Sequence, residues 1–155
     1  MNILVTGGAG YIGSHTSVEL INAGHNVICI DNLSNSKYEA VKRVEQITGG
    51  KIKFYEGDIR DAKILDKIFK KNKIDAVINF AGLKAVGESC AKPIEYYECN
   101  INGLLVLVNA MRKHNVKNLV FSSSATVYGK PERVPITEDF PLSTSNPYGS
   151  TKLFI

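Results

Sequence analysis

The chain has 155 residues, of which 44% are hydrophobic and 22% charged, a balance typical of one globular domain. Its net charge is +4, but the basic residues are spread along predicted outer helix faces and do not gather beside stacking aromatic residues, which argues against nucleic-acid binding. Cys29, Cys90 and Cys99 have spacings that suit neither a zinc site nor a disulfide framework, and no apolar run approaches the roughly 18 residues of a membrane span. We therefore expect a cytoplasmic protein with reduced thiols that binds neither metal, nucleic acid nor membrane.

The first predicted elements are a strand and a helix joined by a glycine-rich turn. Residues 3–5 form a short apolar run typical of a buried parallel strand, and helical spacing follows from about Tyr11 to Asn22. The residues that this spacing places on the inner face of the helix are Ile12, Thr16, Leu20 and Ala23.

The turn itself has a phosphate-binding pattern. Residues 8–13 fit G-x-G-x-x-G, and Gly7, Gly10 and Gly13 fit a G-x-x-G-x-x-G spacing. Such glycines allow a tight turn, let a pyrophosphate approach the backbone and let the helix pack closely on the strand. Phosphates would then meet the N–H groups at the start of the helix. Glycine also serves ordinary strand-to-helix turns, so the assignment depends on the residues that follow.

A second predicted strand, residues 26–30, leads directly into Asp31. The spacing from Gly13 to Asp31 is close to the about 20 residues expected of an acid that hydrogen-bonds an adenosine ribose. A carboxylate there would repel a 2′-phosphate, so the sequence favours NAD over NADP. The alternative is that Asp31 serves only as a helix cap or turn former.

The rest of the chain continues to alternate strand and helix. The further predicted strands are residues 52–56, 74–81 and 118–121, and the further predicted helices are about 37–47, the segment capped by Asp61, about 93–114 and the segment from Pro147 onward. The apolar face predicted for the helix at 93–114 consists of Ile94, Tyr97, Ile101, Leu104, Leu105, Val108 and Met111. Five strand–helix repeats imply an α/β fold, a Rossmann-type doubly wound parallel sheet.

The last predicted helix carries a candidate acid/base pair. Tyr148 and Lys152 are four residues apart, so both side chains lie on one helix face. A neighbouring ammonium favours the anionic form of a phenol, and such a tyrosine can exchange a proton with a sugar hydroxyl. Ser124, at the end of the preceding predicted strand, can hydrogen-bond the same oxygen. A Tyr and a Lys at this spacing also occur on ordinary helices, so the pair gains its weight from the NAD-type fold around it.

Several runs of the sequence resemble the extended short-chain dehydrogenase/reductase family. They are residues 6–15, 31–33, 35–37, 57–60, 80–89, 121–129 and 147–149 together with Lys152. The runs 80–89 and 121–129 are similar to the members that epimerise UDP-sugars. The resemblance implies that Tyr148 is the acid/base, that Lys152 binds the nicotinamide ribose, and that Ser124 binds the reacting hydroxyl.

The glycine pattern and the resemblance together assign two sets of ligand-binding residues. Those assigned to NAD are Gly7, Gly10, Tyr11, Ile12, Gly13, Asp31, Asn32, Leu33, Ser34, Asn35, Ser36, Asp58, Ile59, Phe80, Ala81, Gly82, Leu83, Lys84, Tyr148 and Lys152. Those assigned to the UDP-sugar substrate are Lys84, Ser124 and Tyr148. Cys99 stands where the family usually has an asparagine that contacts the cofactor, which predicts slightly weaker NAD retention.

The resemblance implies interconversion of UDP-glucose and UDP-galactose through NAD-dependent oxidation and re-reduction at sugar C4, in a homodimer. A nucleotide-sugar 4,6-dehydratase or decarboxylase of the same family is one alternative. A dehydratase needs an added acid/base pair near Ser124, where this chain has Ala-Thr-Val at residues 125–127. A non-catalytic NAD-binding sensor is the other alternative, but it has no need of Ser124, Tyr148 and Lys152 together.

The sequence ends at Ile155, only one or two turns into the last predicted helix. Its last three residues, 153–155, are apolar and include no glycine or basic cap. The resemblance implies that further strands and a smaller carboxyl-terminal domain, which closes over the UDP-sugar, are absent. We therefore expect residues 1–155 to be an incomplete NAD-binding Rossmann domain that is inactive alone.

Overall fold

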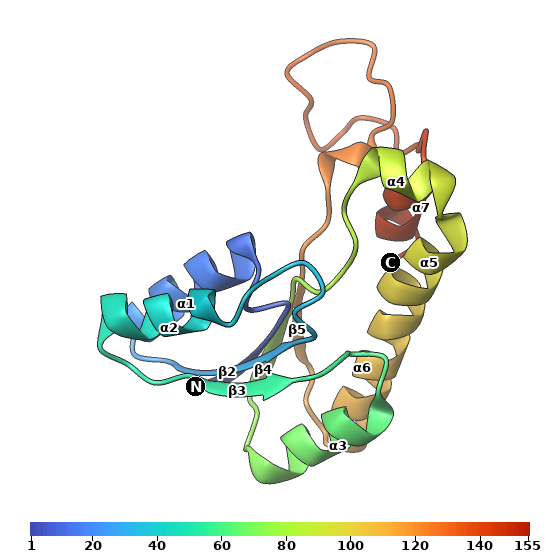
Figure 1. Cartoon of the computed structure of the whole chain (residues 1–155). Coiled ribbons are helices and arrows are strands. Elements are labelled where there is room, and N and C mark those ends of the chain that lie inside the picture. The colour runs from blue at the N-terminus through green and yellow to red at the C-terminus, as the bar shows by residue number, and fades with distance from the viewer. The chain divides into compact units, whose positions relative to one another are not determined.

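Figure 1 shows the computed structural model, which describes all 155 residues. Five parallel strands form one sheet in the order β3-β2-β1-β4-β5. Their bounds are β1 (Asn2–Thr6), β2 (Asn26–Asp31), β3 (Lys53–Glu56), β4 (Ala76–Asn79) and β5 (Asn118–Phe121). The strand order reverses at β1, whose Thr6 is aligned with Ile30 of β2 on one side and Asn79 of β4 on the other. The predicted parallel α/β sheet is confirmed, although β4 is shorter than the predicted 74–81.

The helices fall into two compact units, each described here by itself. The bounds are α1 (Tyr11–Asn22), α2 (Glu39–Thr48), α3 (Ala62–Lys71), α4 (Val86–Ala91), α5 (Pro93–Tyr97), a π-helix (Glu98–Asn102), α6 (Gly103–Lys113), a 3₁₀ helix (Ala125–Val127) and α7 (Pro147–Phe154). The first unit, residues 1–81 and 104–122, contains the sheet; the second, residues 82–103 and 123–155, contains α4, α5, the π-helix and α7. None of the helices has both the length and the apolar character needed to cross a membrane.

Helices cover both faces of the sheet in the first unit. Leu4 and Ile30 pack on one face against a cluster that includes Leu65 of α3 and Leu107 of α6. On the other face, Val5 and its neighbours pack against side chains of α1, and a further cluster joins β2 to α2. Figure 1 shows α1 and α2 on one side of the sheet and α3 on the other. This burial on both sides explains why the strands are apolar runs and do not alternate between apolar and polar residues.

Helix α1 has the predicted bounds, but its predicted inner face is only partly right: Leu20 packs against the core cluster that contains Val5, as predicted, whereas two other members do not. Ile12 is 49% exposed and Ala23 is also exposed, whereas the buried residues are Gly13 and Ser17. Gly13 lies against the backbone of the glycine turn, so the helix is rotated toward its smallest side chains. The buried Ser17 hydroxyl has a hydrogen-bond partner, because it donates to the Gly13 carbonyl oxygen at 2.8 Å. Contact between backbones, which hydropathy does not register, decides this face.

The continuous helix predicted at 93–114 is also wrong. It is divided into α5, the π-helix and α6, and the Gly103 N–H donates to the Glu98 carbonyl oxygen across the wider turn. Ile94, which was predicted to be buried, is 74% exposed, while Tyr96 and Asn100 are buried instead. A π-turn adds one residue to the helix and so changes which side chains face inward. The short helix α4 was not predicted at all.

Cys29 provides a test of the packing beneath the glycine turn. Its side chain is buried in β2, and that burial, with a smaller contribution from the Asp31 charge, raises the pKa of the thiol to about 12. Because the folded-state pKa lies above the unfolded value near 8.5, the contribution of Cys29 to the stability of the fold is fully present below about pH 8.5 and is lost as the pH rises toward 12. We expect a thiol reagent at pH 8 to modify the exposed Cys90 quickly and Cys29 only in denaturant. Rapid modification of native Cys29, identified by peptide mass spectrometry, would contradict this packing.

Candidate functional site

In the first unit, the turn after β1 has a shape that only glycine permits. Gly7 has φ +65°, and a Cβ added there would lie 2.7 Å from the backbone nitrogen of Ala81. A Cβ on Gly13 would overlap the Gly7 carbonyl oxygen and lie 2.7 Å from the Gly8 Cα. Gly10 caps α1 without any side-chain hydrogen bond, so the first N–H groups of the helix remain available to a ligand. The arrangement fits the predicted approach of a pyrophosphate to the backbone.

Substituting Gly13 tests the requirement for close backbone contact. In Gly13→Ala the new methyl group must push α1 away from the turn, and we expect a loss of about 1–3 kcal/mol in the free energy of unfolding. Urea denaturation measures the change. Gly87→Ala is the matched control, since a Cβ at Gly87 would meet nothing within 4 Å and alanine is the better helix former. A Gly13→Ala variant as stable as Gly87→Ala would show that α1 does not rest on the turn.

Asp31, at the end of β2, is hydrogen-bonded to two loops of the first unit. Its Oδ2 accepts from the Ala9 N–H of the glycine turn at 3.0 Å. Its Oδ1 accepts from the Leu33 N–H at 2.9 Å and from the Ser36 hydroxyl at 2.8 Å. Leu33 has φ +56°, an uncommon conformation that the bond to Asp31 helps to hold. Asp31 is therefore a turn former, which agrees with the alternative interpretation. Its carboxylate also lies next to the glycine turn, and the predicted bond to a ribose stays a prediction.

Asp58 lies beside the same loop. Arg60 donates to it from Nε at 2.9 Å and from Nη2 at 2.7 Å, and Asn32 Nδ2 donates at 3.0 Å. The Arg60 side-chain hydrogen bonds are the main reason that the pKa of Asp58 is lowered to about 2. The side chain of Ile59, by contrast, is buried in the hydrophobic core, so it anchors the loop and does not face a ligand with its side chain. The structure thus brings the predicted residues 31–36 and Asp58 together.

Two buried polar residues of this unit were missed. The Thr6 hydroxyl donates to Asn79 Oδ1 at 2.6 Å, and its oxygen accepts from the Ala81 N–H at 3.3 Å. These bonds fix the chain where β4 ends and the predicted Phe80 and Ala81 follow. A polar residue at the last position of an apolar strand was the signal that could have identified both.

In the second unit, the buried amide of Asn100 connects three segments. Its Oδ1 accepts from the Leu83 N–H at 2.8 Å, and its Nδ2 donates to the Leu83 carbonyl oxygen at 3.0 Å and to Thr151 Oγ1 at 2.9 Å. The Thr151 hydroxyl donates in turn to the Tyr148 carbonyl oxygen at 2.7 Å. A Cβ on Gly82 would lie 2.9 Å from Asn100 Oδ1. Asn100, absent from the predicted site, thus positions the predicted residues 82–84 and α7, while Lys84 is exposed.

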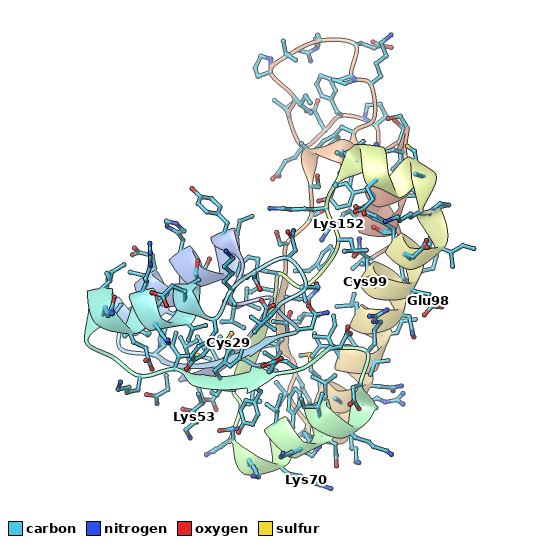
Figure 2. All side chains as sticks on the ribbon, in the orientation of Figure 1. Cys29, Lys53, Lys70, Glu98, Cys99 and Lys152 are labelled. Atoms are coloured by element: carbon cyan, nitrogen blue, oxygen red, sulfur yellow. The ribbon has the colours of Figure 1, made fainter.

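Helix α7 presents the predicted acid/base pair on one face. Asn146 caps it by accepting from the Gly149 N–H at 2.8 Å, and Pro147 occupies its first turn. Tyr148 and Lys152 are both buried, with Lys152 Nζ 6.0 Å from the centre of the Tyr148 ring. Burial lowers the pKa of Lys152, and an electrostatic interaction with the side chain of Cys99 opposes that effect. Figure 2 shows the labelled side chains of Lys152 and Cys99 close to each other.

Ser124 lies in the same unit as this pair. Its Oγ caps the 3₁₀ helix by accepting from the Thr126 N–H at 3.2 Å and from the Thr126 hydroxyl at 3.0 Å. Those bonds use the lone pairs of Ser124 and leave its own O–H to donate. The 3₁₀ helix packs against α7, since a Cβ on Gly149 would lie 3.0 Å from the Thr126 carbonyl oxygen. The unit therefore combines a hydroxyl donor, a phenol and an ammonium, the groups needed to move a proton at an alcohol.

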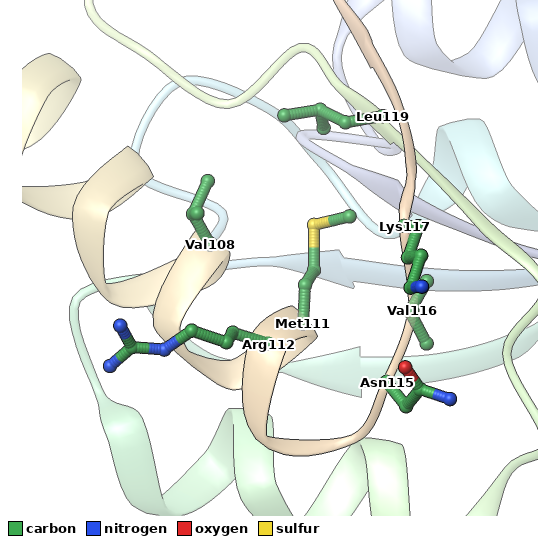
Figure 3. A pocket seen from close by; sticks show the side chains of 7 residues that line it. All are labelled: Val108, Met111, Arg112, Asn115, Val116, Lys117 and Leu119. Carbon is green, nitrogen blue, oxygen red and sulfur yellow. The ribbon is translucent and has the colours of Figure 1, made fainter.

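A separate pocket of about 360 Å³ lies at the opposite edge of the sheet from the glycine turn, where α6 ends and β5 begins (Figure 3). Its lining residues are Val108, Met111, Arg112, Asn115, Val116, Lys117 and Leu119. None of them is a predicted site residue.

Comparisons with known proteins point to one kind of enzyme. The sequence profile of the GDP-mannose 4,6 dehydratase family matches residues 4–155. Two curated relatives are the UDP-glucose 4-epimerases of Bacillus subtilis, 61% identical over 155 residues, and Dictyostelium discoideum, 64% identical over 153 residues. The matches cover 100% and 99% of this chain, respectively, but 46% and 44% of the relatives. The chain therefore spans about half the length of the curated relatives it matches.

Solved structures agree. The UDP-glucose 4-epimerase from Bifidobacterium longum, in complex with NAD⁺ and UDP, matches with a TM-score of 0.98 at 58% identity, over 99% of this chain and 46% of that one. The UDP-glucose 4-epimerase from Brucella ovis, in complex with NAD, matches with a TM-score of 0.90 at 42% identity, over 99% and 45%. The similarity extends over both compact units.

Proposed function

The chain belongs to the GDP-mannose 4,6 dehydratase family, and from that membership we propose that its protein interconverts UDP-glucose and UDP-galactose with NAD as cofactor. The observation that carries the proposal is the placement of Tyr148, Lys152 and Ser124 within one compact unit of a chain 61% identical to a named UDP-glucose 4-epimerase. The two structural relatives crystallised with NAD support the choice of cofactor.

The first unit fits the dinucleotide part of NAD. Its glycine turn has no room for a Cβ at Gly7 or Gly13, and the start of α1 offers uncapped N–H groups for the phosphates. Asp31 Oδ2 accepts one N–H bond, from Ala9, which leaves lone-pair capacity for a ribose hydroxyl. We propose that Asp58, with its carboxylate fixed by Arg60, contributes on the adenine side. The chemistry that NAD would supply when bound is removal of a hydride from sugar C4 and its return to the same carbon, so the overall reaction would involve no net oxidation.

The second unit supplies the proton chemistry. We propose that the Tyr148 phenolate takes the proton of the sugar C4 hydroxyl and returns it, while the Lys152 ammonium stabilises the anionic phenol. Ser124 donates to the same sugar oxygen and stabilises its developing charge. Lys84, which is exposed, is available to a substrate phosphate. Cys99 lies near Lys152 in place of the usual asparagine and offers a weaker donor to the cofactor.

The family profile is named for a dehydratase, yet the residues beside Ser124 favour the epimerase. Elimination of water needs an additional acid/base pair at the sugar. The 3₁₀ helix that follows Ser124 consists of Ala125, Thr126 and Val127, none of which has a carboxylate. The epimerase needs only the proposed proton relay of Ser124, Tyr148 and Lys152, which lie in the second unit.

Two properties of the whole protein complete the proposal. We propose a homodimer, which the exposed apolar side chains Leu105 and Val108 on α6 support. We also propose a cytoplasmic location, supported by three cysteines, none of which is in a disulfide.

Chromatography of UDP-sugars tests the proposal. UDP-galactose is incubated without added NAD, separately with the gene's full-length product and with the 155-residue chain, and UDP-glucose is quantified by HPLC. We expect conversion by the full-length product, from cofactor it retains, and none by the 155-residue chain, because the chain spans only 46% of this relative's length and we propose that the remainder completes the substrate crevice. Absence of conversion by both, even with NAD added, would refute the substrate assignment.

A further inference from the structure

Tyr96 has a role that neither the sequence patterns nor the comparisons assign. We propose that Tyr96, held by Glu88, is a positioning residue that fixes the ring of Tyr148 and, through a separate contact, the loop at residues 83–85. The inference rests on the proposed function for its catalytic consequence. All four segments that it involves, the loop, α4, α5 and α7, belong to the second compact unit.

The ring of Tyr96 forms one wall around the proposed acid/base. Tyr96 is completely buried, and its ring meets that of Tyr148 edge to face, with centroids 6.5 Å apart and planes at 81°. This is a preferred geometry for two aromatic rings. The second neighbour of the Tyr148 ring is a charged group: the Lys152 ammonium lies 6.0 Å from the ring centre. Since the Tyr148 phenol must point at the reacting hydroxyl, the ring contact with Tyr96 limits the angle at which it can do so.

The hydroxyl of Tyr96 is fixed at the other end of the side chain. It accepts from the Ala85 N–H at 3.0 Å and lies 2.9 Å from the Ala85 carbonyl oxygen and 3.0 Å from Glu88 Oε2, both of which can accept its proton. Burial, and the bond to Glu88, raise the pKa of Tyr96, which keeps the phenol protonated and able to donate. Lys92 Nζ lies 3.2 Å from Glu88 Oε1, so the carboxylate that bonds Tyr96 also forms an ion pair with Lys92. Because the Tyr96 ring is buried and its hydroxyl is hydrogen-bonded to the Ala85 backbone, the ring has little freedom to move and can hold the neighbouring Tyr148 ring in place.

The two ends of Tyr96 predict two separable effects. The ring acts on Tyr148, and so on turnover; the hydroxyl acts on Ala85 and on the adjacent Lys84, and so on ligand retention. Tyr96→Leu removes both ends, whereas Tyr96→Phe keeps the ring and removes only the hydroxyl. Tyr97→Phe is the matched control, because Tyr97 is the next residue on α5 and is exposed.

The experiment measures kcat, KM for UDP-galactose and the rate of NAD release for the three variants of the full-length product, with the thermal midpoint of each. We expect Tyr96→Leu to lower kcat about 100-fold, since a misplaced catalytic group costs about that factor, with a much smaller change in KM. We expect Tyr96→Phe to keep kcat within about threefold, because its ring contact survives, but to release NAD faster than Tyr97→Phe. Equal losses of kcat in Tyr96→Leu and Tyr96→Phe, or losses that appear in KM alone, would overturn the role of the ring.

A failure of the proposed function is distinguishable from a failure of this inference. If the unmodified protein shows no turnover, the function assignment is wrong and the NAD-release measurement alone decides the positioning role. Faster release from Tyr96→Phe than from Tyr97→Phe then supports the fixed loop, and identical release overturns it.

Discussion

We expect replacement of Tyr148 by phenylalanine to lower the proposed turnover of UDP-galactose about 1,000-fold in the full-length product, within the usual range for loss of a general acid/base. The phenyl ring keeps the contacts of the buried side chain with Tyr96 and Lys152, so the fold and the bound NAD are expected to remain. Only the hydroxyl that we propose to exchange the proton is lost. HPLC of the UDP-sugars measures the rate, and the absorbance of released NAD after denaturation measures cofactor content.

Two further variants make this result specific. Tyr97→Phe removes a hydroxyl from an exposed tyrosine of the same unit and is expected to retain full turnover. Lys152→Met removes the ammonium while preserving a long side chain in the buried position, and we expect a loss of similar order to that of Tyr148→Phe, because both act on one phenolate. A Tyr148→Phe enzyme that retains a tenth or more of its activity would remove Tyr148 from the proton relay.

Replacing Asn100 with alanine lowers the free energy of unfolding by about 3 kcal/mol, because three hydrogen bonds are lost and both backbone polar groups of Leu83 lose their partner. The loss also frees Thr151 and thereby the start of α7. We expect NAD release to accelerate as well, since the predicted cofactor residues 82–84 are no longer held. Urea unfolding followed by far-UV circular dichroism gives the free energy.

Asn102→Ala is the control for this prediction. Asn102 is also an amide of the π-helix, but its side chain is exposed and donates to Glu98 Oε2 at 3.3 Å at the surface, so we expect a change within about 0.5 kcal/mol. Equal stability of Asn100→Ala and Asn102→Ala would show that the buried amide network does not stabilise the second unit.

The sheet and most element boundaries could be predicted because their determinants are local. Apolar runs of three to eight residues identified the strands, and the N-cap Asp61 was predicted from its position before helical spacing. Asp61 accepts from the N–H groups of Lys63 and Ile64, as a cap should.

The errors arose where a distant backbone decided the outcome. Periodicity could not show that α1 is turned by the contact of Gly13 with the glycine turn. Nor could it show the π-turn at residues 98–102, which delivers Asn100 to Leu83 and Thr151, segments that lie 17 and 51 residues away in the sequence. The same long-range bonds hide Asn100 from any local pattern. The ligand roles of residues such as Asp31 and Lys84 stay predictions.

The reversal of strand order at β1 has a consequence for the chain as it leaves the ribosome. The first strand made is the central one, and its second neighbour, β4, follows only at residues 76–79. At about 5–20 residues per second, β1 and β2 can pair several seconds before β4 exists. During that interval one edge of the central strand is open to pairing with another nascent chain. Slow decoding between β2 and β4 would prolong this exposure, so the yield of soluble protein should depend on translation speed through residues 32–75.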